Sequence, residues 1–180
     1  GSLAELEEVS THELTHALQY SILYGESLRS LKLFRSVFVP TWVMEGMAEH
    51  VAGDWDPAGE MVLRDAVLND GVLSLKDLAT FAFLGGRTYL AYKEGQSVMD
   101  FIARERGEAR LSEFMKKYAR QWTPTQILRS FYAESEPDPV TGEGKNRGMD
   151  LETLEARWLR GEKEKAWALA LGRNHPSDYG

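Results

Sequence analysis

The chain has 180 residues, a net charge of −7 and no cysteine. This length suits one hydrophobic core without a linker, so we expect a single domain over 1–180. The acidic balance argues against nucleic-acid binding, since there is no basic stripe to neutralise phosphates. The lack of thiols excludes disulfides and thiolate zinc sites, and no apolar run approaches the ~18 residues that span a bilayer.

The first predicted element is a helix over 3–23 that carries His-Glu-Leu-Thr-His at 12–16, after a Gly-Ser pair at 1–2 typical of a cloning scar. Residues four apart share one helix face, so His12 and His16 can bind one zinc ion at about 2.0–2.1 Å. Glu13 projects one position round, where it can take a proton from a metal-activated water. Alternatively, His12 and His16 could belong to a salt-bridged helix surface that binds no metal. We expect the buried side of this helix to consist of Val9, Leu14, Ala17, Leu18 and Ile22.

A second helix is predicted over 41–52, between Pro40 and Gly53. Most of its side chains should face the core, yet Glu45 and Glu49 lie among them, one turn apart. Buried carboxylates need a partner or a metal, and two histidines with one glutamate form an established zinc set. The spacing alone does not determine whether Glu45 or Glu49 would be the third zinc ligand. The expected core residues are Trp42, Val43, Met47, Ala48, Val51 and Ala52, and the alternative to a metal is ion pairing with Arg29, Lys32 or Arg35.

The rest of the chain predicts further helices separated by turns. Asp56 and Pro57 form a typical helix start. The polar, Gly- and Pro-rich segment 134–149 predicts a mobile surface loop, and 172–180 a frayed tail. The expected helices cover 56–69, a short helix opening at 74–77, 88–106, 108–121, 124–132 and 161–171, with a turn at 69–71 and a short extended segment or loop at 31–39. The predicted fold class is therefore mainly α.

One segment resembles the W-L-N-E-G-F-A signature of gluzincin metallopeptidases, the peptidase MA-like group that includes thermolysin and aminopeptidase N. The segment reads Trp42-Val-Met-Glu45-Gly46-Met-Ala48. This resemblance implies that Glu45 is the zinc ligand. It also implies that Glu49, one turn later, accepts a hydrogen bond from a ligating histidine and so orients its ring.

Another segment, Tyr92-Lys93-Glu94-Gly95, resembles the Y-E-K-G motif of the aminopeptidase N group with its two middle residues in reversed order. The resemblance implies that Tyr92 donates a hydrogen bond to the oxyanion formed during hydrolysis. Tyr89, three residues earlier on the same face, is a rival for that role. Residues 151–159 resemble the closing helix of such domains, so the likeness runs from about residue 9 to 160.

Together these likenesses imply hydrolysis of a peptide or protein substrate by zinc-activated water. His12, His16 and Glu45 would hold Zn²⁺, with Glu13 as general base and Tyr92 as oxyanion donor. The G-x-M-E-N segment of aminopeptidases is absent, so aminopeptidase specificity is not implied.

In gluzincins a β-sheet precedes the first metal-binding helix, and its edge strand pairs with the substrate. Here the helix starts almost at residue 3. We therefore expect a helical zincin-type catalytic subdomain, with an N-terminal β-containing region elsewhere in the same full-length protein. The alternative is a catalytically incompetent zinc-binding module of a larger protein that serves structure or interaction.

Overall fold

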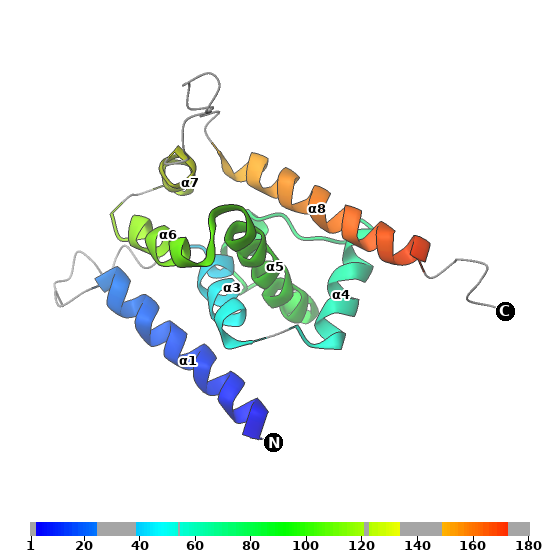
Figure 1. Ribbon diagram of the computed structural model, residues 1–180, viewed down its shortest axis with the longest axis horizontal. Helices are drawn as coiled ribbons and strands as arrows, with labels where there is room; N and C mark the ends of the chain where they lie inside the picture. Colours follow the sequence, from blue (N-terminus) through cyan, green and yellow to red (C-terminus); the bar gives the residue numbers. More distant parts are fainter. Residues whose placement is uncertain (1–2, 25–38, 54, 121–122, 134–148, 173–180) are drawn as a thin grey trace.

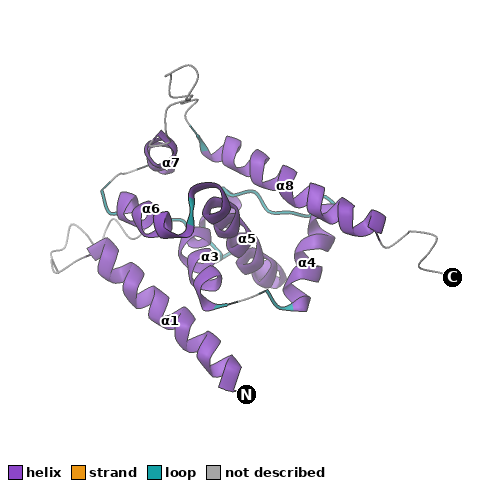
Figure 2. Cartoon of the chain, viewed as in Figure 1, coloured by secondary structure: helices purple, strands orange, loops and turns teal. Residues whose placement is uncertain are grey.

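The computed structural model describes residues 3–24, 39–53, 55–120, 123–133 and 149–172, and helices dominate these ranges (Figure 1). Within them there is no strand, as the colouring in Figure 2 shows. This confirms the predicted mainly α fold class. None of the helices in the described ranges has the length and hydropathy needed to cross a membrane.

Most predicted helix boundaries are reproduced within a residue or two. The α-helices are α1 (Leu3–Tyr24), α3 (Thr41–Ala52), α4 (Pro57–Leu68), α5 (Thr88–Arg106), α6 (Leu111–Tyr118), α7 (Pro124–Ala133) and α8 (Leu151–Gly172), and the 3-10 turns are η1 (Asp77–Ala79), η2 (Gly85–Arg87) and η3 (Glu108–Arg110). The Asp56 side chain accepts the Gly59 N–H at 2.7 Å with Pro57 in the first turn, so the predicted cap of α4 forms. The expectation of one helix over 108–121 was wrong, because a 3-10 turn precedes α6 and α6 ends at Tyr118.

The core lies around α3 and α5, which pack side by side in the centre of the molecule (Figure 1). α1 contacts α3 and α6 on one side, whereas α4 contacts α5 and α8 on the other. The helices can approach closely because Gly46 of α3 meets Gly95 of α5. The largest fully buried side chains include Trp42, Trp158, Phe114, Phe131, Met99 and Ile102.

The predicted buried face of α1 was wrong. Val9, Leu14 and Leu18 are 60%, 62% and 58% exposed, and Ala17 is exposed as well, whereas Ile22 packs partly against the core. α1 instead turns a mostly polar side inward, and its fully buried residues are Thr15, Gln19 and Leu23. The inward face is polar because α3 presents carboxylates to it. Apolar spacing identified a face of the helix, but the neighbouring helix determined which face became buried.

Three smaller expectations are also corrected. Val51 at the end of α3 is 49% exposed rather than in the core. Met149 is buried, so it does not belong to a mobile surface loop, and Gly172 is the last residue of α8 rather than the start of a tail. The remainder of the predicted loop and tail, and residues 31–38, lie outside the described residues.

Candidate metal centre

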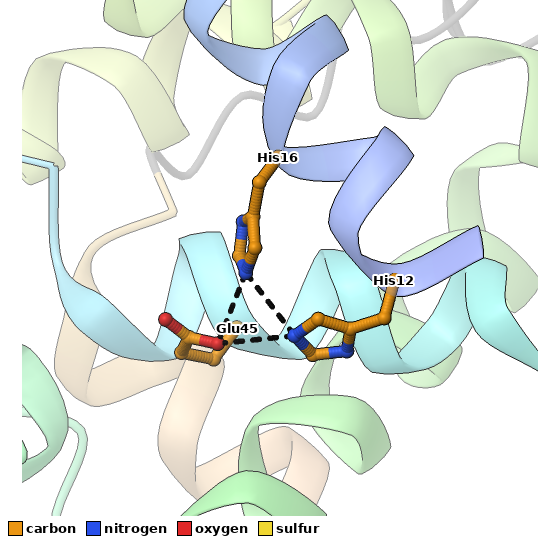
Figure 3. Close-up of side chains that lie close together, drawn as sticks. All are labelled: His12, His16 and Glu45. Carbon is orange, nitrogen blue, oxygen red and sulfur yellow. Dashed lines mark hydrogen bonds and ion pairs between the residues drawn. The ribbon is translucent and has the colours of Figure 1, made fainter. Parts of the chain in front are cut away.

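Two turns of α1 and one of α3 bring three metal-binding side chains together, as Figure 3 shows. The Nε2 atoms of His12 and His16 are 3.1 Å apart. Oε2 of Glu45 lies 3.5 Å from Nε2 of His12 and 3.3 Å from Nε2 of His16. All three side chains are partly buried. The structure thus brings together the two histidines of the motif with Glu45.

The spacing of these three atoms suits a tetrahedral zinc ion. Ligand atoms that lie about 2.0–2.1 Å from a tetrahedral zinc ion are about 3.3–3.4 Å from one another. The observed separations of 3.1, 3.3 and 3.5 Å bracket this value. Two imidazoles and one carboxylate also match the donor set of a catalytic zinc site, which leaves a fourth position open. The residues present therefore fit zinc.

Each imidazole has a polar neighbour at its other nitrogen, an acidic one at His12 and an amide at His16. Nδ1 of His12 lies 3.1 Å from Oε1 of Glu49, and Nδ1 of His16 lies 2.8 Å from Oε1 of Gln19. Since a carboxylate oxygen and an amide oxygen can only accept, both contacts favour the tautomer that leaves Nε2 free to bind a metal ion. Glu49 thus stands where a carboxylate that orients His12 is expected.

Sequence reasoning missed Gln19. This side chain is 2% exposed, and its amide nitrogen donates to the main-chain carbonyl of Met44 at 2.9 Å. It therefore connects His16 on α1 to the residue that precedes Glu45 on α3. The i,i+3 spacing of His16 and Gln19 was readable from the sequence. Its contact with Met44 depends on how the two helices pack, and no sequence signal pointed to it.

The site also contains a buried cation that the sequence analysis did not assign. Nζ of Lys93 on α5 lies 2.9 Å from Oε2 of Glu49 and 3.2 Å from Oδ2 of Asp56. The ion-pairing partners considered from the sequence, Arg29, Lys32 and Arg35, lie outside the described residues. Within the described ranges Glu49 pairs with Lys93 and with His12.

The two candidate tyrosines point in different directions. Burial raises the pKa of Tyr92 above its ordinary value, and the charges of Glu45 and Glu49 together with a hydrogen bond to Glu45 raise this pKa further. The Tyr92 hydroxyl is therefore a neighbour of the Glu45 carboxylate. Tyr89 instead donates its hydroxyl to the carboxylate of Asp56 at 3.1 and 3.2 Å.

An open cleft of about 430 Å³ is lined by two of the candidate ligands, His16 and Glu45. His16 and Glu45 form one wall together with Glu13, whose carboxylate is exposed to solvent. The rest of the lining is mainly apolar or aromatic and comprises Tyr20, Leu23, Tyr24, Val39, Thr41 and Met44. The cleft can therefore present a solvent-exposed carboxylate, two candidate metal ligands and several apolar or aromatic side chains to one bound molecule.

His50, the remaining histidine in the described ranges, has its own set of hydrogen-bond partners. Nδ1 of His50 lies 2.6 Å from Oδ1 of Asp100, and Nε2 lies 3.0 Å from Oε2 of Glu108. The hydrogen bond to Asp100 is the main cause that raises the pKa of His50, and burial opposes it. Trp55 donates to the other oxygen of Asp100 at 2.7 Å. His50 thus ties α3 to α5 and η3, away from the metal centre.

Comparison with known families agrees with this geometry. A family model described as the Peptidase MA superfamily matches residues 8–136. This span contains the three candidate ligands as well as Glu13, Glu49 and Tyr92. No curated protein and no solved structure matches the chain.

Proposed function

The chain belongs to the peptidase MA superfamily, and we propose that it is a gluzincin-type, zinc-dependent peptidase. One observation carries the proposal. Two imidazole nitrogens and a carboxylate oxygen converge within 3.1–3.5 Å of one another. This donor set and this spacing are those of a catalytic zinc site. His12, His16 and Glu45 would hold Zn²⁺, which when bound polarises the scissile carbonyl and acidifies water.

Glu13 is the proposed general base. Its carboxylate lies at the cleft next to His16, and its charge is felt by the Tyr92 hydroxyl. It would take a proton from the attacking water and pass it to the leaving amine. Tyr92 would donate its hydroxyl hydrogen bond to the oxyanion, because its raised pKa keeps that hydroxyl protonated.

The cleft suggests the class of substrate. Tyr20, Leu23 and Met44 line the cleft together with the candidate ligands His16 and Glu45. Burial of an apolar side chain there would stabilise binding in proportion to the area removed from water. We therefore expect preferred cleavage beside a large apolar residue of a peptide.

Replacement of Glu13 by Gln tests the mechanism. The variant should bind one zinc ion per chain as the parent does, because Glu13 is not a ligand. Its hydrolysis of a peptide library should fall by at least about 100-fold, since the general base is lost. Metal analysis and mass-spectrometric detection of cleaved peptides provide both readouts.

The outcomes separate the two functions under consideration. Cleavage by the Gln variant at the parental rate would show that the mechanism is wrong. Zinc-dependent thermal stability without hydrolysis by the parent would instead support the non-catalytic binding module.

A further inference from the structure

A chain of polar contacts leads from a candidate ligand into the interior of the protein. Nδ1 of His12 lies 3.1 Å from Oε1 of Glu49, and Nζ of Lys93 donates to the other oxygen of Glu49 at 2.9 Å. Lys93 also lies 3.2 Å from Oδ2 of Asp56 and donates to Oε1 of Gln96 at 3.2 Å. An ammonium group has three N–H donors, so Glu49, Asp56 and Gln96 together satisfy it.

The fold builds a specific enclosure for this ammonium group. Lys93 is only 5% exposed, which is rare for a lysine and is tolerated only when the charge is paired. Its Nζ lies 5.7 Å from the ring centroid of Trp55 and 5.9 Å from that of Tyr89. Its stem runs past Gly59, where a Cβ atom would come within 2.8 Å of Cε. These neighbours leave the side chain little freedom.

The positive charge of Lys93 offsets a charge repulsion between two carboxylates of α3. Glu45 and Glu49 lie one turn apart on the same face and carry like charges, which disfavours an ordered arrangement. With Lys93 bound to Oε2, Glu49 is held so that Oε1 lies 3.1 Å from Nδ1 of His12. We infer that Lys93 is a positioning residue for the metal centre, which acts by fixing Glu49 and through it the ring of His12. This inference rests on the proposed function, since it takes His12 to be a zinc ligand.

The positive charge of Lys93 has an opposing effect, because it repels a divalent cation. Two carboxylates contact the ammonium at 2.9 and 3.2 Å and compensate its charge locally. The carboxylate of Glu49 and the ring of His12 also separate it from the centre. The orientation of Glu49 and His12 should therefore outweigh the repulsion between Lys93 and the zinc ion. Removal of Lys93 should weaken zinc binding. Loss of a partner of this kind typically lowers metal affinity about 10-fold to 100-fold.

A double-mutant cycle on the 180-residue chain tests the inference. Lys93→Met keeps the stem and removes the charge, Glu49→Gln removes the carboxylate, and the double variant combines both. The zinc dissociation constant is measured by competition with a chromophoric chelator, and the d–d absorption spectrum of the Co²⁺-substituted protein reports the ligand geometry. Lys93→Met should raise the zinc dissociation constant by about 10-fold or more and change the cobalt spectrum. In the Glu49→Gln background the same replacement should have little further effect.

Two further variants control the measurement. Lys76→Met removes an exposed lysine that pairs with Glu152, far from the ligands in sequence, and should leave zinc affinity unchanged. Lys93→Arg keeps the charge with a different donor geometry and should recover part of the lost affinity. If Lys93→Met fails to fold, as circular dichroism would reveal, Lys93→Gln, which also lacks the positive charge, takes its place in the cycle with Glu49→Gln.

The inference is overturned if Lys93→Met binds zinc as tightly as the parent or more tightly. It is also overturned if the replacement weakens zinc binding equally in the Glu49→Gln background, because Lys93 would then not act through Glu49. A parent chain that binds no zinc would remove the proposed function and this inference together. Normal zinc binding by the parent with an unaffected Lys93→Met variant would remove the inference alone.

Discussion

Gly46 of α3 and Gly95 of α5 meet backbone to backbone, and a Cβ atom on Gly46 would lie 2.3 Å from the carbonyl oxygen of Gly95. Each glycine is close in sequence to a residue of the proposed site. Glu45 immediately precedes Gly46, and Tyr92 lies one turn before Gly95. The close approach of the two helices therefore sets how far the ligand on one helix lies from the hydroxyl on the other.

Replacement of Gly46 by Ala should destabilise the protein, because the added methyl group meets backbone atoms that cannot rotate away. Overpacking of this kind costs about 1–3 kcal/mol, and a backbone clash should reach the upper part of that range. Urea unfolding at neutral pH measures the change. Gly161→Ala within α8 is the matched control, since a Cβ atom there meets no atom of the described residues within 4 Å. It should raise stability by about 0.5–1 kcal/mol.

Glu94 predicts a decline in stability as the pH rises. Burial raises the pKa of Glu94 to about 8, although the N–H of Leu73 and the charge of Arg87 lower it in part. Between its unfolded pKa of about 4.5 and a folded pKa of about 8, the folded state holds a proton that the unfolded state has released. The free energy of unfolding therefore falls across this window as pH rises.

The Glu94→Gln variant tests this pH dependence, because the amide can still accept from Leu73 and does not titrate. Its free energy of unfolding should fall less steeply between pH 5 and pH 8 than that of the parent. Urea titrations at four pH values measure both slopes. Comparison with the parent cancels the contribution of His50, which also loses stabilisation as the pH rises. Equal slopes would contradict the assignment.

Gln19 should contribute to zinc affinity through His16. Gln19→Met preserves volume but removes the acceptor for Nδ1 of His16 and the donor to Met44. The zinc dissociation constant should rise by about 10-fold to 100-fold. Thr15→Val is the control, since within the described ranges its buried hydroxyl donates to the Thr11 carbonyl of the same helix and to no other element. An equal loss of zinc affinity in both variants would indicate general disturbance of α1 instead.

The two tyrosines of α5 allow a matched comparison of the proposed peptidase activity. Tyr92→Phe should lower kcat by about 100-fold with little change in KM, because an oxyanion donor acts mainly in the transition state. Tyr89→Phe loses a hydrogen bond to Asp56 and should retain activity close to the parent. Steady-state kinetics on one cleaved peptide give kcat and KM for both variants and show which tyrosine contributes to the activity. Greater loss in Tyr89→Phe would reverse the assignment.

Local sequence determined most of the helical framework. Pro40 and Gly53 bound α3, and Asp56 caps α4 by accepting from a backbone N–H three residues away. Interactions of this kind join residues within one turn and form in almost any tertiary context. The four-residue spacing of His12 and His16 likewise places both imidazoles on one side of α1 in any helix.

Tertiary packing decided the rest of the centre. Spacing left Glu45 and Glu49 equivalent, and the way α3 crosses α1 turned Glu45 toward both Nε2 atoms and Glu49 toward Nδ1 of His12. The roles of Gln19 and Lys93 depend on partners 25 and 44 residues away. The buried face of α1 was mispredicted for the same reason. A helical pattern specifies which side chains share a face, but only the neighbouring helices determine what that face meets.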